Sequence, residues 1–267
     1  MRLSSGKPFA FLLALLALAS VALFLSKQWL PVTASQHAAI LDQQLHWTLL
    51  DSAVLFVSAQ LLLAVLIWTS QIDGKNTRKT PPRAITASVW LATAFIALEI
   101  FTAATLGRSA WAAMYTQDVN PDTVRVQALG QQFAFYFRYP GADGKFGPIH
   151  VSKIDPSIGN YFGLDPLHDA AARDDISSAT LVLPVGRPVE IMLLAQDVIH
   201  GFYIREMRIQ QDMVPGMEIP VRFTPTRIGK YEIACSQLCG LGHYRMRAFL
   251  QVVPEQDFQA WLRTHAH

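Results

Sequence analysis

The sequence predicts a membrane-anchored protein with an all-β outer domain: a transmembrane helical hairpin, preceded by a signal peptide or a third helix, and followed by a β-sandwich. Three observations predict this fold class. Apolar residues make up 51% of the 267 residues and are concentrated in long runs near the N-terminus. A short basic loop joins the two longest runs. After them the pattern changes to short alternating segments separated by glycine and proline.

The first apolar run, 9–25, follows Arg2 and Lys7. A charged start, an apolar middle and small residues near position 34 are the layout of a secretory signal. The same run also fits a membrane helix. Residues 1–34 are therefore predicted to be either a signal peptide or an N-terminal transmembrane segment.

Residues 35–108 are predicted to form the hairpin, with transmembrane helices at about 47–69 and 85–107. Each run is long enough to cross the hydrocarbon core, which needs about 20 helical residues. The loop between them is basic, with Lys75, Arg78, Lys79 and Arg83. Because basic short loops stay in the cytoplasm, residues 109–267 are predicted to lie on the outer side of the membrane.

Two acidic residues, Asp51 and Glu99, fall inside the apolar runs. Carboxylates are costly in lipid and usually face protein or water. Asp51 fits a helix-end carboxylate as well as it fits a buried partner, whereas the deeper Glu99 favours a partner inside the membrane.

The outer domain, 109–267, is rich in short alternating segments typical of strands. Eight such segments predict a sandwich. They are 123–129, 131–139, 179–183, 189–195, 198–204, 219–223, 229–234 and 246–253. Residues 145–178 lack periodicity and are predicted to be an insertion, and 254–265 is predicted to be an amphipathic helix beginning at a proline.

Charge excludes one class of partner. The formal net charge is only +2, which gives no signal of nucleic-acid binding. No nucleic-acid partner is expected.

The residues that carry chemistry are concentrated between Ala234 and Met246. They are Cys235, Cys239, His243 and Met246, with His200 as an upstream candidate. Thiolates, thioethers and imidazoles favour copper, whereas calcium or magnesium would require oxygen ligands that this loop lacks. Gly240 and Gly242 allow a tight loop that turns several side chains toward one point.

Three other interpretations compete. The two cysteines could form a disulfide, which leaves the histidine and methionine unexplained. Two cysteines and two histidines could hold structural zinc, which does not need Met246. A mononuclear blue-copper site needs two histidines, one cysteine and an axial methionine, so one cysteine is surplus. A second thiolate four residues away most simply indicates a second metal bridged by both sulfurs.

With these residues the sequence resembles subunit II of the haem-copper cytochrome c oxidases. The family's Cys-x-x-x-Cys-x-x-x-His-x-x-Met loop is matched at Cys235, Cys239, His243 and Met246, and its upstream histidine at His200. Further resemblance lies in 197–202, in 212–216, in 229–231 and in the transmembrane hairpin, so it covers roughly Trp47 to the C-terminus.

The resemblance implies a cupredoxin-like Greek-key sandwich that carries a binuclear copper centre, CuA. It implies that Cys235 and Cys239 bridge two copper ions and that His200 and His243 bind one ion each. Met246 and the backbone carbonyl of Gln237 would be weak ligands. The protein supplies position and electronic environment to the metal.

The chain departs from the family in two places. Gln237 stands where the family usually has a glutamate that also binds magnesium, and an amide is a poorer ligand for a hard cation. Magnesium is therefore not predicted. The family's tryptophan-rich stretch corresponds to 132–139, which has no tryptophan. Phe133 and Tyr136 either line an electron-entry surface or belong to the core.

The implied function is that of subunit II of a terminal cytochrome c oxidase in a bacterial inner membrane, with the CuA domain on the periplasmic side. The expected partners are cytochrome c, membrane lipid, subunit I with its haems, and subunit III. Oxygen reduction and proton translocation would occur outside this chain, which would not be catalytic alone. The alternative from another class is a membrane-anchored copper-binding or copper-delivery protein.

Overall fold

The structure is a computed structural model that describes residues 6–25, 30–69, 82–115 and 121–266. The chain divides into two compact units, one formed by Met1–Pro31 and Asp42–Ala110, the other by Val32–Leu41 and Trp111–His267. We refer to them as the helical unit and the β unit. The predicted loop residues Lys75, Arg78 and Lys79 lie outside the described residues.

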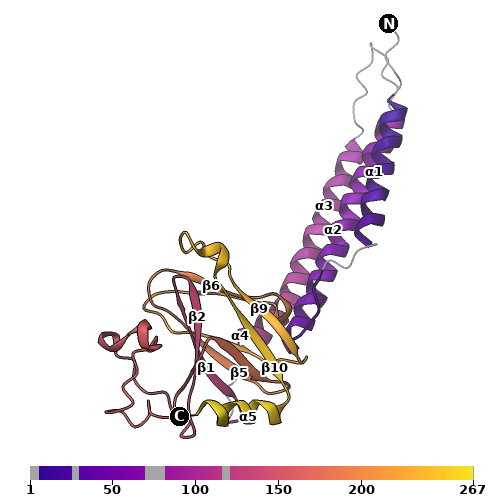
Figure 1. Cartoon of the computed structure of the whole chain (residues 1–267). Helices are drawn as coiled ribbons and strands as arrows, with labels where there is room; N and C mark the ends of the chain where they lie inside the picture. The colour runs from indigo at the N-terminus through magenta and orange to yellow at the C-terminus, as the bar shows by residue number, and fades with distance from the viewer. Residues whose placement is uncertain (1–5, 26–29, 70–81, 116–120, 267) are drawn as a thin grey trace. The chain divides into compact units, whose positions relative to one another are not determined.

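The helical unit consists of long apolar helices (Figure 1). They are α1 (Lys7–Leu25), α2 (Gln36–Thr69) and α3 (Pro82–Thr102), and α3 continues through a π-helical turn η1 (Ala103–Gly107) into α4 (Arg108–Tyr115). Three of the described helical stretches are long and apolar enough to cross a membrane: Lys7–Leu25, Gln36–Trp68 and Val89–Ala112. Helix α2 begins before the predicted 47–69 because polar residues can continue a helix beyond the apolar run.

The carboxyl groups of Asp51 on α2 and Glu99 on α3 lie close enough to interact. Glu99 thus has a polar partner within this chain, on the neighbouring helix.

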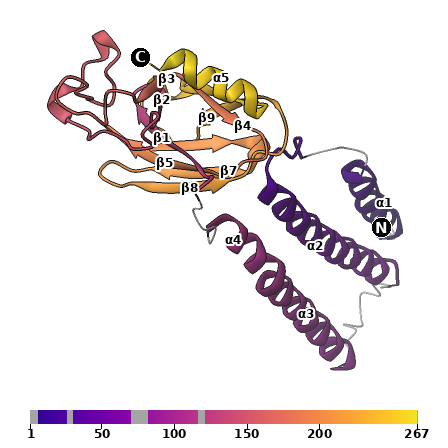
Figure 2. The same cartoon turned by 90° about the horizontal axis from the view of Figure 1, so that it is seen from below.

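The β unit is a two-sheet sandwich (Figure 2). Its strands are β1 (Val124–Gln131), β2 (Ala134–Tyr139), β3 (Ile176–Ser178), β4 (Thr180–Pro184), β5 (Val189–Ala195), β6 (His200–Ile204), β7 (Ile209–Met213), β8 (Ile219–Phe223), β9 (Gly229–Cys235) and β10 (Arg247–Val253). One sheet has the order β3-β2-β1-β5-β8 and the other β4-β10-β9-β6-β7. The predicted fold class, membrane helices followed by an all-β sandwich, is confirmed.

The core lies between the two sheets, because alternate residues of each strand point inward. Strand β10 shows this alternation, with Ala248, Leu250 and Val252 buried and Phe249 at the surface. Large side chains buried in this core are Phe135, Phe137, Tyr139, Leu181, Leu183, Ile191, Leu193, Phe202, Ile204 and Phe223.

Two of these strands carry no clear sequence signal. Strand β3 falls inside the predicted insertion 145–178 and pairs with β2 through Phe137 and Ser178, so the insertion ends before Ile176. Strand β7 contains Gln210, Gln211 and Asp212 and pairs with β6. Both are edge strands. Edge strands tolerate polar residues because one side of the ladder needs no partner strand.

The insertion is attached to the sandwich by a buried ion pair. Arg138 on β2 binds the carboxylate of Asp175, with Nη2 2.5 Å and Nε 3.0 Å from Oδ2, and both side chains are fully buried. The guanidinium also donates to the carbonyl of Gly147, and its Cζ lies 5.2 Å and 5.7 Å from the ring centroids of Phe146 and Phe162. These contacts fix both ends of the insertion to one strand.

Helix α5 (Glu255–His265) closes the sandwich edge where β4 lies. Its Phe258 and Trp261 rings pack against Tyr139, with ring centroids 6.4 Å and 4.9 Å away. The Tyr139 hydroxyl donates to the carbonyl of Val182 and accepts from its N–H, so the same tyrosine joins the two sheets.

Candidate metal centre

The predicted loop connects two neighbouring antiparallel strands, β9 and β10. Cys235 is the last residue of β9, and a short 3-10 helix, η5 (His243–Arg245), returns the chain to Met246 just before β10. Because both strand ends are fixed by the sheet, the loop between them folds back onto the sandwich. His200 begins β6, which lies beside β9.

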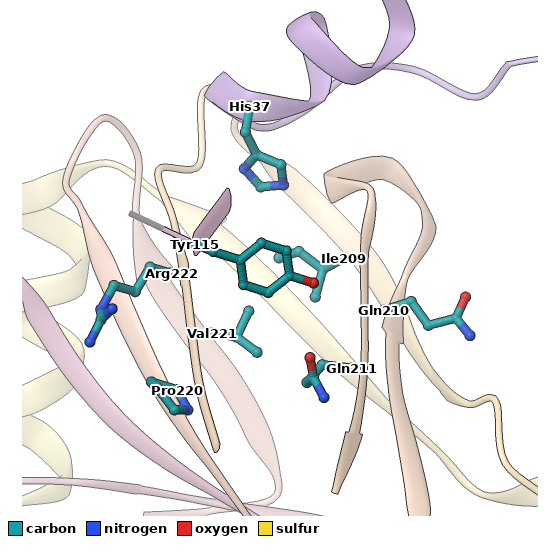
Figure 3. A pocket seen from close by; sticks show the side chains of 8 residues that line it. All are labelled: His37, Tyr115, Ile209, Gln210, Gln211, Pro220, Val221 and Arg222. Carbon is teal, nitrogen blue, oxygen red and sulfur yellow. The ribbon is translucent and has the colours of Figure 1, made fainter. Parts of the chain in front are cut away.

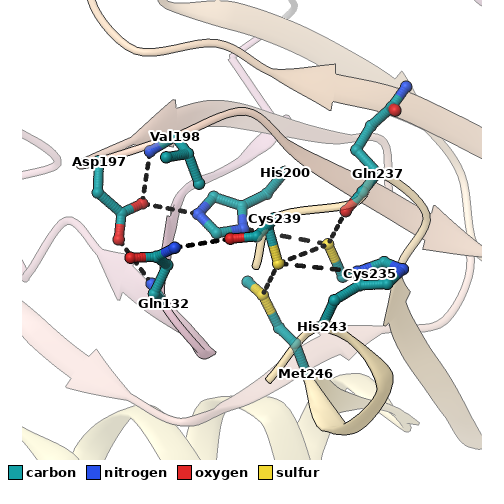
Figure 4. A network of polar contacts seen from close by, with 9 residues as sticks. All are labelled: Gln132, Asp197, Val198, His200, Cys235, Gln237, Cys239, His243 and Met246. Carbon is teal, nitrogen blue, oxygen red and sulfur yellow. Dashed lines mark hydrogen bonds and ion pairs between the residues drawn. The ribbon is translucent and has the colours of Figure 1, made fainter. Parts of the chain in front are cut away.

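The structure brings all six predicted site residues together (Figure 4). The Cys235 and Cys239 sulfurs are 3.8 Å apart, and no disulfide joins them. Nδ1 of His200 lies 4.0 Å from the Cys235 sulfur, and Nδ1 of His243 lies 3.7 Å from the Cys239 sulfur. The Met246 sulfur is 3.7 Å from Cys239, and the Gln237 carbonyl oxygen is 3.2 Å from Cys235.

The donor atoms form a compact group, with one histidine beside Cys235 and the other beside Cys239. His200, Cys235 and Cys239 have ligand atoms within 4.8 Å of one another. His243 and Met246 approach from the Cys239 side instead. Each sulfur therefore has its own imidazole nitrogen beside it.

Three of the six site residues are buried, and Cys235, Gln237 and His243 are half-buried. His200 is fully buried, and Cys239 and Met246 are only 3% and 2% exposed. Burial, together with the neighbouring Cys235, raises the pKa of the Cys239 thiol to about 11. A metal ion that binds this sulfur as a thiolate must displace its proton.

Glycines let the loop approach the sandwich. Gly240 has a φ of 131°, in the region that disfavours side chains. A Cβ at Gly201 would lie 2.1 Å from the Ser236 hydroxyl oxygen and 2.9 Å from the Gln237 backbone nitrogen. Strand β6 can therefore lie directly against the loop only because position 201 has no side chain.

Asp197 fixes the orientation of His200. Its Oδ1 is 2.8 Å from Nε2 of His200 and its Oδ2 accepts from the Gln132 N–H at 2.7 Å. Since a carboxylate can only accept, Nε2 carries the hydrogen and Nδ1 presents a lone pair toward Cys235. Burial raises the pKa of Asp197, but hydrogen bonds from Gln132, His200 and Val198 lower it by more, so the carboxyl pKa lies below its usual range.

Gln132 and Asp212 also hold the loop, and the sequence predicted no role for either. The Gln132 side chain donates to the carbonyl of Cys239 at 2.6 Å, which connects the β1–β2 turn to the loop. The Gln237 amide donates to both carboxylate oxygens of Asp212, at 2.9 Å and 3.0 Å. The spacing of Asp197 three residues before His200 was a usable signal, whereas Gln132 lies too far along the chain to be linked by any local pattern.

The aromatic stretch 132–139 divides between the surface and the core. Phe133 is 40% exposed and its ring lies against Gly240 and Gly242 of the loop. Tyr136 stacks on Tyr161 of the insertion, with ring centroids 3.5 Å apart. Phe133 and Tyr136 were both considered for an electron-entry surface. Of the two, Phe133 lies beside the metal loop, which is the segment 235–246 that carries the candidate ligands.

The family model and the curated relatives agree on one family. Residues 124–253 match the family model described as cytochrome c oxidase subunit II, periplasmic domain. The alternative cytochrome c oxidase subunit 2 of Bradyrhizobium diazoefficiens is 32% identical over 257 residues, covering 95% of this chain and 90% of the relative. Cytochrome c oxidase subunit 2 of Cereibacter sphaeroides is 27% identical over 231 residues, covering 82% of this chain and 75% of the relative.

Among solved structures, the periplasmic domain of subunit II of cytochrome oxidase from Bradyrhizobium japonicum is similar, at 24% identity and a TM-score of 0.41. The match covers 55% of this chain and 96% of that structure.

Proposed function

The chain belongs to the cytochrome c oxidase subunit II family, and from this premise we propose that it is the electron-entry subunit of a haem-copper oxidase. The family assignment makes it a component of an oxidoreductase complex with a cupredoxin-like outer domain. Its apolar helices fit membrane anchoring. The finer function rests on the candidate metal centre.

The donor set fits copper, which the family implies. Two thiol sulfurs, two imidazole nitrogens and a thioether converge, and this combination of soft and borderline ligands favours copper over magnesium or calcium. The two free sulfurs 3.8 Å apart, each with its own imidazole, are the observation that carries the proposal of a binuclear centre. One copper ion in a mononuclear blue-copper site would use both imidazoles and leave one sulfur without a role.

In this proposal Cys235 and Cys239 would both hold the copper pair, and His200 and His243 would each supply an imidazole ligand. Met246 and the carbonyl of Gln237 would be weak ligands. When bound, the copper pair supplies acceptance and release of single electrons. Magnesium is not part of the proposed centre, because Gln237 presents an amide that already donates to Asp212.

The chain's own residues keep the donor positions fixed. Asp197 holds the His200 ring in one tautomer, and Gln132 holds the backbone at Cys239. His200, Cys239 and Met246 are buried, whereas Cys235, Gln237 and His243 are half-buried. Such fixed positions limit rearrangement when the charge of the centre changes, which favours fast electron transfer.

We place the β unit on the periplasmic side of a bacterial inner membrane, where it takes electrons from cytochrome c. The electrons pass to haem in subunit I, where oxygen is reduced to water and protons are translocated. Subunit III completes the expected complex. The metal loop exposes Leu238, Leu241 and Tyr244 at 83%, 97% and 76%. An apolar rim beside a redox centre is suited to contact with a partner protein.

Copper counting tests the proposal. The full chain, purified in detergent and loaded with copper, is expected to hold two copper ions and to give a paramagnetic spectrum of one electron shared by two nuclei. Cys235→Ser and Cys239→Ser should each abolish the shared-electron spectrum, whereas Leu238→Ala in the same loop should not. One copper per chain with a single-copper spectrum would contradict the binuclear centre.

A second measurement separates this function from copper delivery. A delivery protein should give up Cu(I) readily to a chelator and should not exchange electrons rapidly with reduced cytochrome c. We expect retained copper and rapid reduction of the loaded chain.

A further inference from the structure

The start of helix α2 is built into the β unit, at the sandwich edge opposite α5. Strands β7 and β8 are the last strands of their two sheets at this edge. Ala34 donates to the carbonyl of Glu206 and accepts from Thr226, and Ser35 forms a bridge with Pro225. The segment therefore covers the open edge, with Ala34, Ser35, His37 and Ala38 buried and Gln36 exposed.

A cavity of about 20 Å³ remains beneath this segment, between the two edge strands. It is lined by Ile209, Gln210 and Gln211 of β7, by Pro220, Val221 and Arg222 of β8, and by Tyr115 and His37. Figure 3 shows the His37 ring pointing from the first turn of α2 into the space between the strands, toward Tyr115 and Val221. The cavity belongs to neither the metal centre nor its loop.

His37 is the unusual member of this lining. It is only 2% exposed, and its Nε2 has no hydrogen-bond partner among the described residues. Leaving a buried polar atom without a partner costs free energy. Arg222, the one charged side chain in the lining, is already paired with Glu190 at 2.7 Å.

The hydrogen bonds of Ser35 determine which chemistry Nε2 offers. The Ser35 hydroxyl donates its single hydrogen to the Met207 carbonyl at 2.8 Å. It can therefore only accept from the His37 ring, whose Nδ1 lies 3.4 Å away. Nδ1 then carries the hydrogen and Nε2 presents a lone pair. Burial lowers the pKa of His37 by more than hydrogen bonding to the backbone of Met207 and Arg208 raises it, which agrees with a neutral ring.

A lone pair facing a small cavity calls for a hydrogen-bond donor of matching size. A water molecule needs about 10–15 Å³ and two to four polar partners. The cavity has this room, and Gln211, which is half-buried, and the Tyr115 hydroxyl are polar groups on its other sides. A metal ion would need more ligands than one imidazole, and the lining contains no carboxylate or thiol.

We propose that this cavity is a binding site for one structural water molecule, which donates a hydrogen bond to Nε2 of His37 and links the start of α2 to edge strands β7 and β8. The water completes the closure of this edge, as α5 completes the other. The water gives the buried imidazole a hydrogen-bond partner and leaves the ring neutral. The site is independent of copper.

Magnetic resonance of the full chain, labelled at histidine nitrogens and held in detergent or lipid discs, tests the site directly. We expect Nε2 of His37 to be unprotonated and hydrogen-bonded, with magnetisation passing from water to the neighbouring ring proton. Gln211→Leu, which removes a polar partner and keeps the histidine, should weaken that transfer. A protonated Nε2, or no transfer from water in the unmodified chain, would overturn the proposal.

The melting temperature of a His37 variant provides a second test of the proposed water site. His37→Phe keeps a ring but removes the acceptor, and should lower the melting temperature by about 2–4 °C because the cavity loses a water-mediated hydrogen bond. His168→Phe, at an exposed position of the insertion, is the matched control and should change little. If His37→Phe is as stable as the unmodified chain, the cavity is dry and the proposal fails. If that variant does not fold, the resonance measurement on the unmodified chain decides.

Discussion

Asp197 shows how one carboxylate prepares a metal ligand before any metal arrives. It accepts from His200 through one oxygen and from the Gln132 backbone through the other. The lone pair of His200 is thereby aimed at Cys235. Residues that hold a ligand in this way commonly affect metal affinity as much as some ligands do.

Asp197→Asn is therefore expected to weaken copper binding by about 10–100-fold. An amide can present its NH₂ to His200, which favours the other tautomer and turns a hydrogen toward the metal. Competition with a Cu(I) chelator measures the affinity. Asp257→Asn, on the exposed face of α5, is the control and should leave it unchanged. Equal affinity in both variants would show that Asp197 does not orient the ligand.

Gln237 suggests a second test at the residue scale. Its amide donates to both oxygens of Asp212. In Gln237→Glu the donor becomes a second carboxylate at the same distance, and like charges so close disfavour ionisation of both. We expect the variant to melt at a lower temperature than the unmodified chain and to regain stability when Mg²⁺ is added, because a divalent cation can bind between two carboxylates.

Melting temperatures with and without Mg²⁺ check this expectation. The unmodified chain should show no specific gain with Mg²⁺ over the same ionic strength of NaCl. Copper content should persist in the variant, because the proposed ligand at this position is the backbone carbonyl. A stabilising effect of Mg²⁺ on both proteins alike would contradict the assignment.

At the scale of elements, the connection between strand β2 and the insertion depends on a buried charge pair. Arg138 and Asp175 are both inaccessible to solvent. Removing one member of such a pair leaves an uncompensated buried charge, which typically costs about 3–5 kcal/mol, whereas replacing both by apolar groups costs much less.

Arg138→Met should accordingly lower the free energy of unfolding by about 3–5 kcal/mol. The double variant Arg138→Met/Asp175→Leu should recover much of that loss. Denaturant unfolding of the β unit within the full chain measures both. Arg187→Met removes the partly exposed pair with Glu255 and should cost no more than about 1 kcal/mol. A double variant as unstable as the single one would mean that the packing of the arginine stem, rather than its charge pair, holds the insertion.

At the scale of the whole molecule, the metal loop presents the apolar rim formed by Leu238, Leu241 and Tyr244. Exposed apolar side chains gathered in one loop indicate a contact surface more often than scattered ones do. The proposed function requires a partner close enough to receive electrons from the buried centre.

The double variant Leu238→Asp/Leu241→Asp should keep its copper but fail to copurify with subunit I, since a charge at the centre of an apolar contact costs desolvation. Leu167→Asp is a matched control, because Leu167 is 83% exposed, as is Leu238, but lies on the insertion. Assembly is measured as the amount of subunit I recovered with the tagged chain. Equal recovery with both variants would place the contact elsewhere.

The sequence by itself determined the features whose signal is local. The membrane helices follow from continuous apolar runs, and the loop donors follow from the spacing of Cys235, Cys239, His243 and Met246 within one connection. Most strands follow from the alternation of apolar and polar residues along the chain. His200 was identified through family resemblance rather than through any local pattern.

Only the tertiary structure decided which distant residues meet. Gln132 reaches the Cys239 carbonyl, Asp175 reaches Arg138, and His37 reaches the gap between β7 and β8. The short edge strands β3 and β7 also became visible only in their sheets. The physical reason is that periodicity and turn chemistry act over a few residues, whereas hydrogen-bond partners and edge closure depend on chain segments that folding alone brings together.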